Sequence, residues 1–133
     1  MTDVFIDTVA LLALWDINDQ WHDTAEKAFL RAHDANWKLL TTSYVLLETG
    51  NAVARKPHRK ALLTLRAGLI SAQSVVEPTE DDCRRAWEAY ARHDAGGAGI
   101  VDLISFEVMR RLALNHALTN DEHFRAAGFE TLM

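Results

Sequence analysis

Short apolar runs of β type alternate with longer helical patterns along this chain, and that alternation constrains the fold more than any other feature. The expected strands are residues 4–6, 38–42, 75–76, 116–119 and 129–132. Apolar residues at helical spacing fill the segments between them. Strands that alternate with helices predict βα units around a parallel sheet. We therefore expect an α/β fold.

Several helix boundaries and one buried stripe can also be predicted. Thr8 and Ser43 are expected to cap helices, because their hydroxyls can accept hydrogen bonds from free backbone N–H groups. A glycine-rich flexible connection at residues 96–99 leads into a strong amphipathic helix over residues 101–115. The helix that begins at Thr79 carries four side chains that are expected to form a core stripe: Cys83, Ala86, Trp87 and Tyr90.

Length and composition fit one domain over residues 1–133. The sequence is 49% hydrophobic and 25% charged, which is ample for a core and argues against disorder. The net charge of −5 makes a strongly basic nucleic-acid clamp an unlikely architecture, but an acidic nucleic-acid enzyme fits. The single cysteine cannot form an intrachain disulfide, and residues 9–15 are too short an apolar run to cross a membrane. We expect a cytoplasmic protein.

Four acidic residues stand out because of their neighbours. Asp7 and Asp121 each follow a short apolar strand, which is where ligands bind in open α/β sheets. Glu48 and Asp102 lie on helices among apolar side chains, and Asp102 shares a face with Ser105. A carboxylate in such company must be neutral, paired with a cation or bound to a metal. Oxygen ligands select Mg²⁺ or Mn²⁺, whereas the plainer interpretation is that each acid caps a helix or pairs with an arginine.

Four segments resemble PIN-domain ribonucleases, and they are most similar to the VapC toxins of prokaryotic toxin–antitoxin pairs. They cover about half the chain in the order of the family: residues 4–8, 46–48, 101–111 and 117–129. The last segment, Leu-Thr-Asn-Asp-Glu-His-Phe followed by Gly-Phe, is the most specific. The resemblance implies a three-layer α/β/α fold with a central, mostly parallel sheet of four to five short strands.

The resemblance also implies an active site. Asp7, Glu48, Asp102 and Asp121 are expected to form one acidic pocket for one or two Mg²⁺ or Mn²⁺ ions, which would activate a water for attack on an RNA phosphodiester. Asp7 and Asp102 are the expected direct ligands. Glu48 would bind the metal or its water, or act as a base, and Asp121 would act through a bound water. Two hydroxyl groups are expected to support the acids by hydrogen bonding, namely those of Thr119 and Ser105.

A basic segment has two interpretations. Its cations, which are expected either to contact RNA phosphates or to form a solvated turn between helices, are Arg55, Lys56, Arg59 and Lys60. The six histidines form no H-E-x-x-H pattern and have no cysteine partners, which argues against zinc. His123 is expected to have a packing or capping role.

The resulting prediction is a metal-dependent endoribonuclease that acts as a toxin, forms a homodimer and is inhibited by an antitoxin protein. A housekeeping RNA-processing nuclease and a catalytically silent RNA- or protein-binding PIN domain remain open alternatives. A haloacid-dehalogenase-type phosphatase would need Asp-x-Asp, but residue 9 is Val. A receiver domain would need an acidic pair and a later lysine, which the sequence does not offer.

Overall fold

The computed structural model describes residues 2–133 and contains five short strands and eight helices in that range. The strands are β1 (Asp3–Ile6), β2 (Lys38–Thr42), β3 (Val75–Val76), β4 (His116–Leu118) and β5 (Glu130–Thr131). They form one sheet in the order β3-β2-β1-β4-β5, and every pairing is parallel. The predicted α/β class and the parallel sheet are confirmed.

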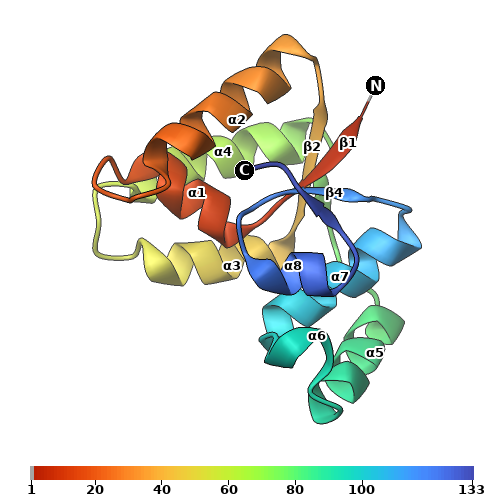
Figure 1. Ribbon diagram of the computed structural model, residues 1–133. Helices are drawn as coiled ribbons and strands as arrows, with labels where there is room; N and C mark the ends of the chain where they lie inside the picture. Colours follow the sequence, from red (N-terminus) through yellow and green to blue (C-terminus); the bar gives the residue numbers. More distant parts are fainter. Residues whose placement is uncertain (1) are drawn as a thin grey trace.

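Helices cover both faces of this sheet, as Figure 1 shows. One face carries α1 (Thr8–Trp15), α2 (His22–Asp34) and α4 (Arg59–Ser71). The other carries α5 (Glu80–Ala91), α6 (Asp94–Gly97), α7 (Ile100–Arg111) and α8 (Glu122–Ala126). The remaining helix, α3 (Ser43–Ala52), directly follows β2. The three-layer arrangement is therefore as expected.

Strand β1 contributes side chains to the hydrophobic cores on both faces of the sheet. Successive side chains of a strand point to opposite faces of its sheet. Val4 and Ile6 accordingly pack with Leu11 and Ala28 on the face of α1 and α2, while Phe5 packs against the helices of the other face. The side chains of Val4, Phe5 and Ile6 are all completely buried. This placement puts the carboxyl end of β1 at the centre of the molecule.

Buried hydroxyl groups fix α3 against the N-terminal half of the chain. Thr8 Oγ1 lies 3.0 Å from Thr49 Oγ1, and Thr49 Oγ1 donates to the Val45 carbonyl oxygen. The predicted caps are each displaced by one residue, because Asp7 occupies the N-cap of α1 and the Thr42 hydroxyl caps α3 by accepting from Val45 N. Thr8 is instead used to join two helices.

Three further expectations are corrected. Helix α7 ends at Arg111 rather than residue 115, because Ala113 adopts a left-handed conformation with φ 56°. Residues 96 and 97 belong to the compact turn α6 instead of a loose connection. The side chains of Trp87 and Tyr90 are 56% and 52% exposed, so they do not belong to the core stripe.

The α5 face that packs against α7 is formed by alanines instead. Ala86 and Ala89 are buried there, and their small side chains let the two helices approach closely. Within residues 2–133 no helix is both long enough and apolar enough to cross a membrane.

Candidate metal centre

The candidate site lies where the strand order of the sheet reverses. From β1 the chain moves outward through β2 and β3 on one side, and β4 and β5 lie on the other. Ligands of open parallel sheets bind outside the carboxyl ends of the strands at such a switch point. Asp7 follows β1 here, and Thr119 and Asp121 follow β4. The backbone N–H of Asp7 donates to the Leu118 carbonyl oxygen across the same gap.

Asp7 is the most deeply buried of the four acids. Its residue is 1% exposed, and its Oδ2 accepts a 3.0 Å hydrogen bond from Thr119 Oγ1. Its Oδ1 is buried and has no hydrogen-bond partner within residues 2–133. Burial raises the pKa of Asp7 to about 6, with Thr119 acting against the rise and the charges of Asp121 and Glu48 adding to it. An unpaired buried carboxylate oxygen is costly, so this atom needs a positive partner.

Asp102 brings a second carboxylate from the other half of the chain. It lies in the first turn of α7. Burial, together with the charges of Asp7, Asp121 and Glu48, raises the pKa of Asp102 to about 7, while His123 acts in the opposite direction. These mutual effects require that all four acids lie near one another, although Glu48 on α3 is itself exposed to solvent. The structure thus brings together the four acids selected from the sequence.

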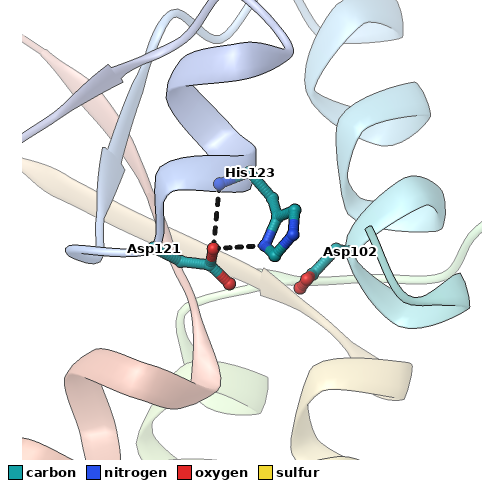
Figure 2. Close-up of side chains that lie close together, drawn as sticks. All are labelled: Asp102, Asp121 and His123. Atoms are coloured by element: carbon teal, nitrogen blue, oxygen red, sulfur yellow. Dashed lines mark hydrogen bonds and ion pairs between the residues drawn. The ribbon is translucent and has the colours of Figure 1, made fainter. Parts of the chain in front are cut away.

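Asp121 and His123 form a tight pair beside Asp102. The backbone N–H of His123 donates to Asp121 Oδ1 at 2.9 Å, and His123 Nδ1 lies 2.6 Å from the same oxygen. Figure 2 shows the imidazole between the two carboxylates, with Nδ1 facing Asp121. One potential ligand atom from each of Asp102, Asp121 and His123 lies within 4.8 Å of the others.

His123 is the residue of this site that sequence reasoning undervalued. Its position two residues after Asp121 was the available signal. The short helix α8 turns that spacing into direct contact, because the Asp121 carboxylate caps the helix at the point where His123 enters it.

The two supporting hydroxyls behave differently. Thr119 donates to Asp7 and accepts from the backbone N–H of Asp121, so it connects two of the acids. Ser105 does not contact the acids in this way. Its Oγ donates to the Val101 carbonyl oxygen within the same helix, 2.9 Å away, which is how a serine in a helix commonly satisfies its hydroxyl.

The basic segment joins α3 to α4 at some distance along the surface from Asp7. Its four cations are exposed, and within residues 2–133 none of them forms an ion pair with an acid. Arg59 Nη1 donates to the Ala54 carbonyl oxygen and so ties the turn together.

A divalent cation fits the residues of this centre. The donors are carboxylate oxygens and one imidazole, the Asp7 oxygen lacks a partner, and no arginine or lysine within residues 2–133 pairs with Asp7 or Asp102. Four neighbouring carboxylates repel one another unless positive charge is supplied. The geometry is therefore that of a candidate metal-binding site at the sheet edge.

A parallel sheet that gathers carboxylates at its switch point makes this protein an open α/β fold with a candidate metal site. The family model for the PIN domain matches residues 4–130, and the chain therefore belongs to the PIN domain family. The resemblance seen in the sequence is confirmed.

Within the PIN domain family, the chain is similar to a characterised endonuclease. The chain is 33% identical over 127 residues to the 23S rRNA-specific endonuclease VapC20 of Mycobacterium tuberculosis, and the match covers 95% of both chains. The crystal structure of that protein, described as a sarcin–ricin loop cleaving toxin, superposes with a TM-score of 0.76 at 31% identity and 95% coverage of both chains.

A more distant structure shares the fold. The DNA-bound VapBC complex of Salmonella typhimurium matches with a TM-score of 0.63 at 17% identity, covering 98% of this chain and 97% of the other.

Proposed function

We propose that this protein is an endoribonuclease whose residues 1–133 act as a single PIN domain and whose activity depends on Mg²⁺ or Mn²⁺. The observation that carries the proposal is the buried Asp7 carboxylate, which has an unpartnered oxygen and three other acids close by. Its similarity to VapC20 along nearly the whole chain supports RNA as the substrate. The reaction is hydrolysis of a phosphodiester bond.

The four acids have different proposed roles, which follow from their positions in the site. Asp7 and Asp102 would bind the cation directly, because their carboxylates are the most strongly destabilised as free anions. A cation held there supplies charge neutralisation at the phosphate and lowers the pKa of a bound water. Thr119 holds the Asp7 carboxylate in place. Glu48 and Asp121, whose charges act on both Asp7 and Asp102, would orient the attacking water by accepting its protons in hydrogen bonds.

A path for the RNA leads from the acids along α3. A cavity of about 400 Å³ borders the site and is lined by Tyr44, Leu47, Glu48, Asn51 and Val101. Its apolar wall suits the face of a base, and the ring of Tyr44 offers a surface for stacking.

Next to this cavity lies a second hollow that reaches the basic segment. Its lining residues are Asn51, Ala52, Ala54, Arg55 and Lys56, so Asn51 borders both hollows. We propose that Arg55, Lys56, Arg59 and Lys60 bind backbone phosphates of the RNA strand beyond the scissile bond, a contact that requires charge but no base reading.

The names of the relatives, a 23S rRNA-specific endonuclease and a toxin, favour ribosomal RNA as the substrate and a toxin role. We further propose that this protein acts in the cytoplasm, forms a homodimer and is inhibited by a cognate antitoxin protein, as in a VapBC-type pair. Expression of the chain alone should arrest growth, and the Asp102→Asn variant should not. Growth arrest by this variant, or normal growth with active wild-type protein, would favour a housekeeping nuclease or a role without cleavage.

The cleavage assay that tests the enzyme uses ribosomes and their isolated RNA with Mg²⁺ or Mn²⁺. We expect discrete fragments, loss of cleavage in EDTA and recovery when the metal is returned. Asp102→Asn should lower the rate at least about a hundredfold, because an oxygen ligand of the metal is lost. Asp34→Asn is the matched control, since Asp34 is an exposed acid at the end of α2. Equal cleavage by the two variants would disprove the proposed site.

A further inference from the structure

The His123 ring is held by its Nδ1 edge, which leaves its other nitrogen free. Nδ1 lies 2.6 Å from Asp121 Oδ1, and a carboxylate oxygen can only accept, so Nδ1 carries the hydrogen. In the neutral imidazole Nε2 then presents a lone pair. The same Asp121 oxygen also accepts the backbone N–H of His123 at 2.9 Å, so side chain and backbone are fixed to one atom.

The edge of the His123 ring that carries Nε2 points away from Asp121. In Figure 2 the edge of the imidazole opposite Asp121 is turned toward Asp102. The candidate ligand atoms of Asp102, Asp121 and His123 lie within 4.8 Å of one another, and no other histidine within residues 2–133 belongs to such a group. The buried Asp7 Oδ1, which has no partner, is an independent sign that a cation belongs at this centre.

The turn α6 packs beside the ring. A Cβ atom on Gly96 would lie 3.9 Å from His123 Cδ2, so the backbone of this turn lies alongside the imidazole. Gly96 and Gly97 have φ values of 70° and 79°, in the left-handed region that glycine adopts without strain. The imidazole is therefore held by Asp121 at Nδ1 and lies near α6 on its Cδ2 side.

We propose that His123 is a ligand of the catalytic metal through Nε2, and that Asp121 acts on that metal chiefly by holding His123. Histidines that bind metals usually donate their other ring N–H to a carboxylate, which is the arrangement of this pair. The inference rests on the proposed function, because it concerns the metal of that site. One imidazole among oxygen ligands favours Mn²⁺ over Mg²⁺, since imidazole nitrogen suits transition metals better.

The test is pulsed electron paramagnetic resonance of Mn²⁺ bound to the full chain, made once with natural isotopes and once with ¹⁵N-labelled histidine. We expect ¹⁴N modulation from a directly bound nitrogen, replaced by the ¹⁵N pattern after labelling. His123→Asn should lose the nitrogen signal and bind Mn²⁺ about 10- to 100-fold more weakly, with a smaller loss for Mg²⁺. His33→Asn, a change at an exposed histidine on α2, should retain both.

The outcomes separate this inference from the enzyme itself. Mn²⁺ that binds without any histidine nitrogen signal would overturn the ligand role while leaving the metal-dependent nuclease intact. A nitrogen signal that persists in His123→Asn would overturn it as well. If Mn²⁺ does not bind the wild-type protein, both the inference and the proposed function fail. Should His123→Asn not fold, the labelled wild-type spectrum alone decides.

Discussion

Asp7 is a residue at which burial and charge oppose each other. Its carboxylate is buried, one oxygen has no hydrogen-bond partner within residues 2–133, and two further acids raise its pKa. Such a residue weakens the metal-free protein and becomes favourable only when positive charge arrives. A binding site that destabilises its own fold is common where function requires a preformed arrangement of like charges.

Neutralising Asp7 should therefore stabilise the metal-free protein in a pH-dependent way. A carboxyl group with a folded pKa of about 6 and an unfolded pKa near 3.8 binds more protons when folded, so stability falls as pH rises between those values. In EDTA, Asp7→Asn should match wild type at pH 4 and exceed it by about 3 kcal/mol at pH 8. Urea unfolding at both pH values measures the difference.

The matched control for this experiment is Asp34→Asn, which removes one exposed acid and should give a pH-independent difference near zero. Saturating Mn²⁺ should reverse the order and make wild type the more stable protein at pH 8. An Asp7→Asn variant that is less stable than wild type in EDTA at pH 8 would contradict the described conflict between burial and charge.

At the scale of the element, one acid of α5 both caps the helix and binds an arginine of α7. Asp82 completes a capping box with Thr79, and its carboxylate also accepts hydrogen bonds from the Arg111 guanidinium at 2.8 to 3.2 Å. Burial alone would raise the pKa of Asp82, but Arg111 and the backbone N–H of Thr79 lower it below its usual value. The contact joins the start of α5 to the end of α7.

Asp82→Ala should destabilise the protein by about 2–3 kcal/mol, because it removes half of the capping box and the charge-assisted hydrogen bonds that the buried Asp82 carboxylate accepts from Arg111. The neighbouring change Asp81→Ala removes an exposed acid that pairs with Arg84 and Arg85 and should cost clearly less stability than Asp82→Ala. Chemical unfolding of the two variants compares them. Equal losses of stability in the two variants would mean that the Asp82–Arg111 pair adds nothing beyond an exposed ion pair.

The conformation of the turn α6 can be tested by a glycine-to-alanine substitution in the turn, with the same substitution in α4 as the control. Gly97→Ala should cost about 1–3 kcal/mol, because residue 97 has φ 79° and a Cβ atom there would lie 2.6 Å from His93 Nε2. Gly68→Ala, in the exposed middle of α4 with no atom near the added carbon, should stabilise by about 0.5–1 kcal/mol. Thermal unfolding should show shifts of opposite sign, and a tolerated Gly97→Ala would contradict the described conformation.

At the scale of the whole molecule, the sequence predicts where part of the candidate site lies because the physics of parallel sheets is simple. The carboxyl ends of parallel strands meet at one edge, so Asp7 and Asp121 were expected to be neighbours although 114 positions separate them. The placement of Glu48 and Asp102 needed the resemblance to PIN domains, since no local pattern says where a helix will pack.

The failures of prediction have physical reasons as well. Trp87 and Tyr90 recur at helical spacing, but the alanines on the neighbouring face of α5 allow closer packing against α7 and take the buried positions. The His123 ring lies near α6, a turn made by left-handed residues that no periodicity reveals. Spacing predicts elements, and tertiary contacts decide which of their faces is used.

The account as a whole claims that Asp7 and Asp102, which come from distant segments, bind one cation beside Glu48 and Asp121. Calorimetric titration of Mn²⁺ into the metal-free wild-type protein and three variants tests this claim most directly. We predict that wild type and Asp34→Asn bind with the same affinity, and that Asp7→Asn and Asp102→Asn each bind at least about tenfold more weakly. Unchanged binding by both site variants would contradict the account.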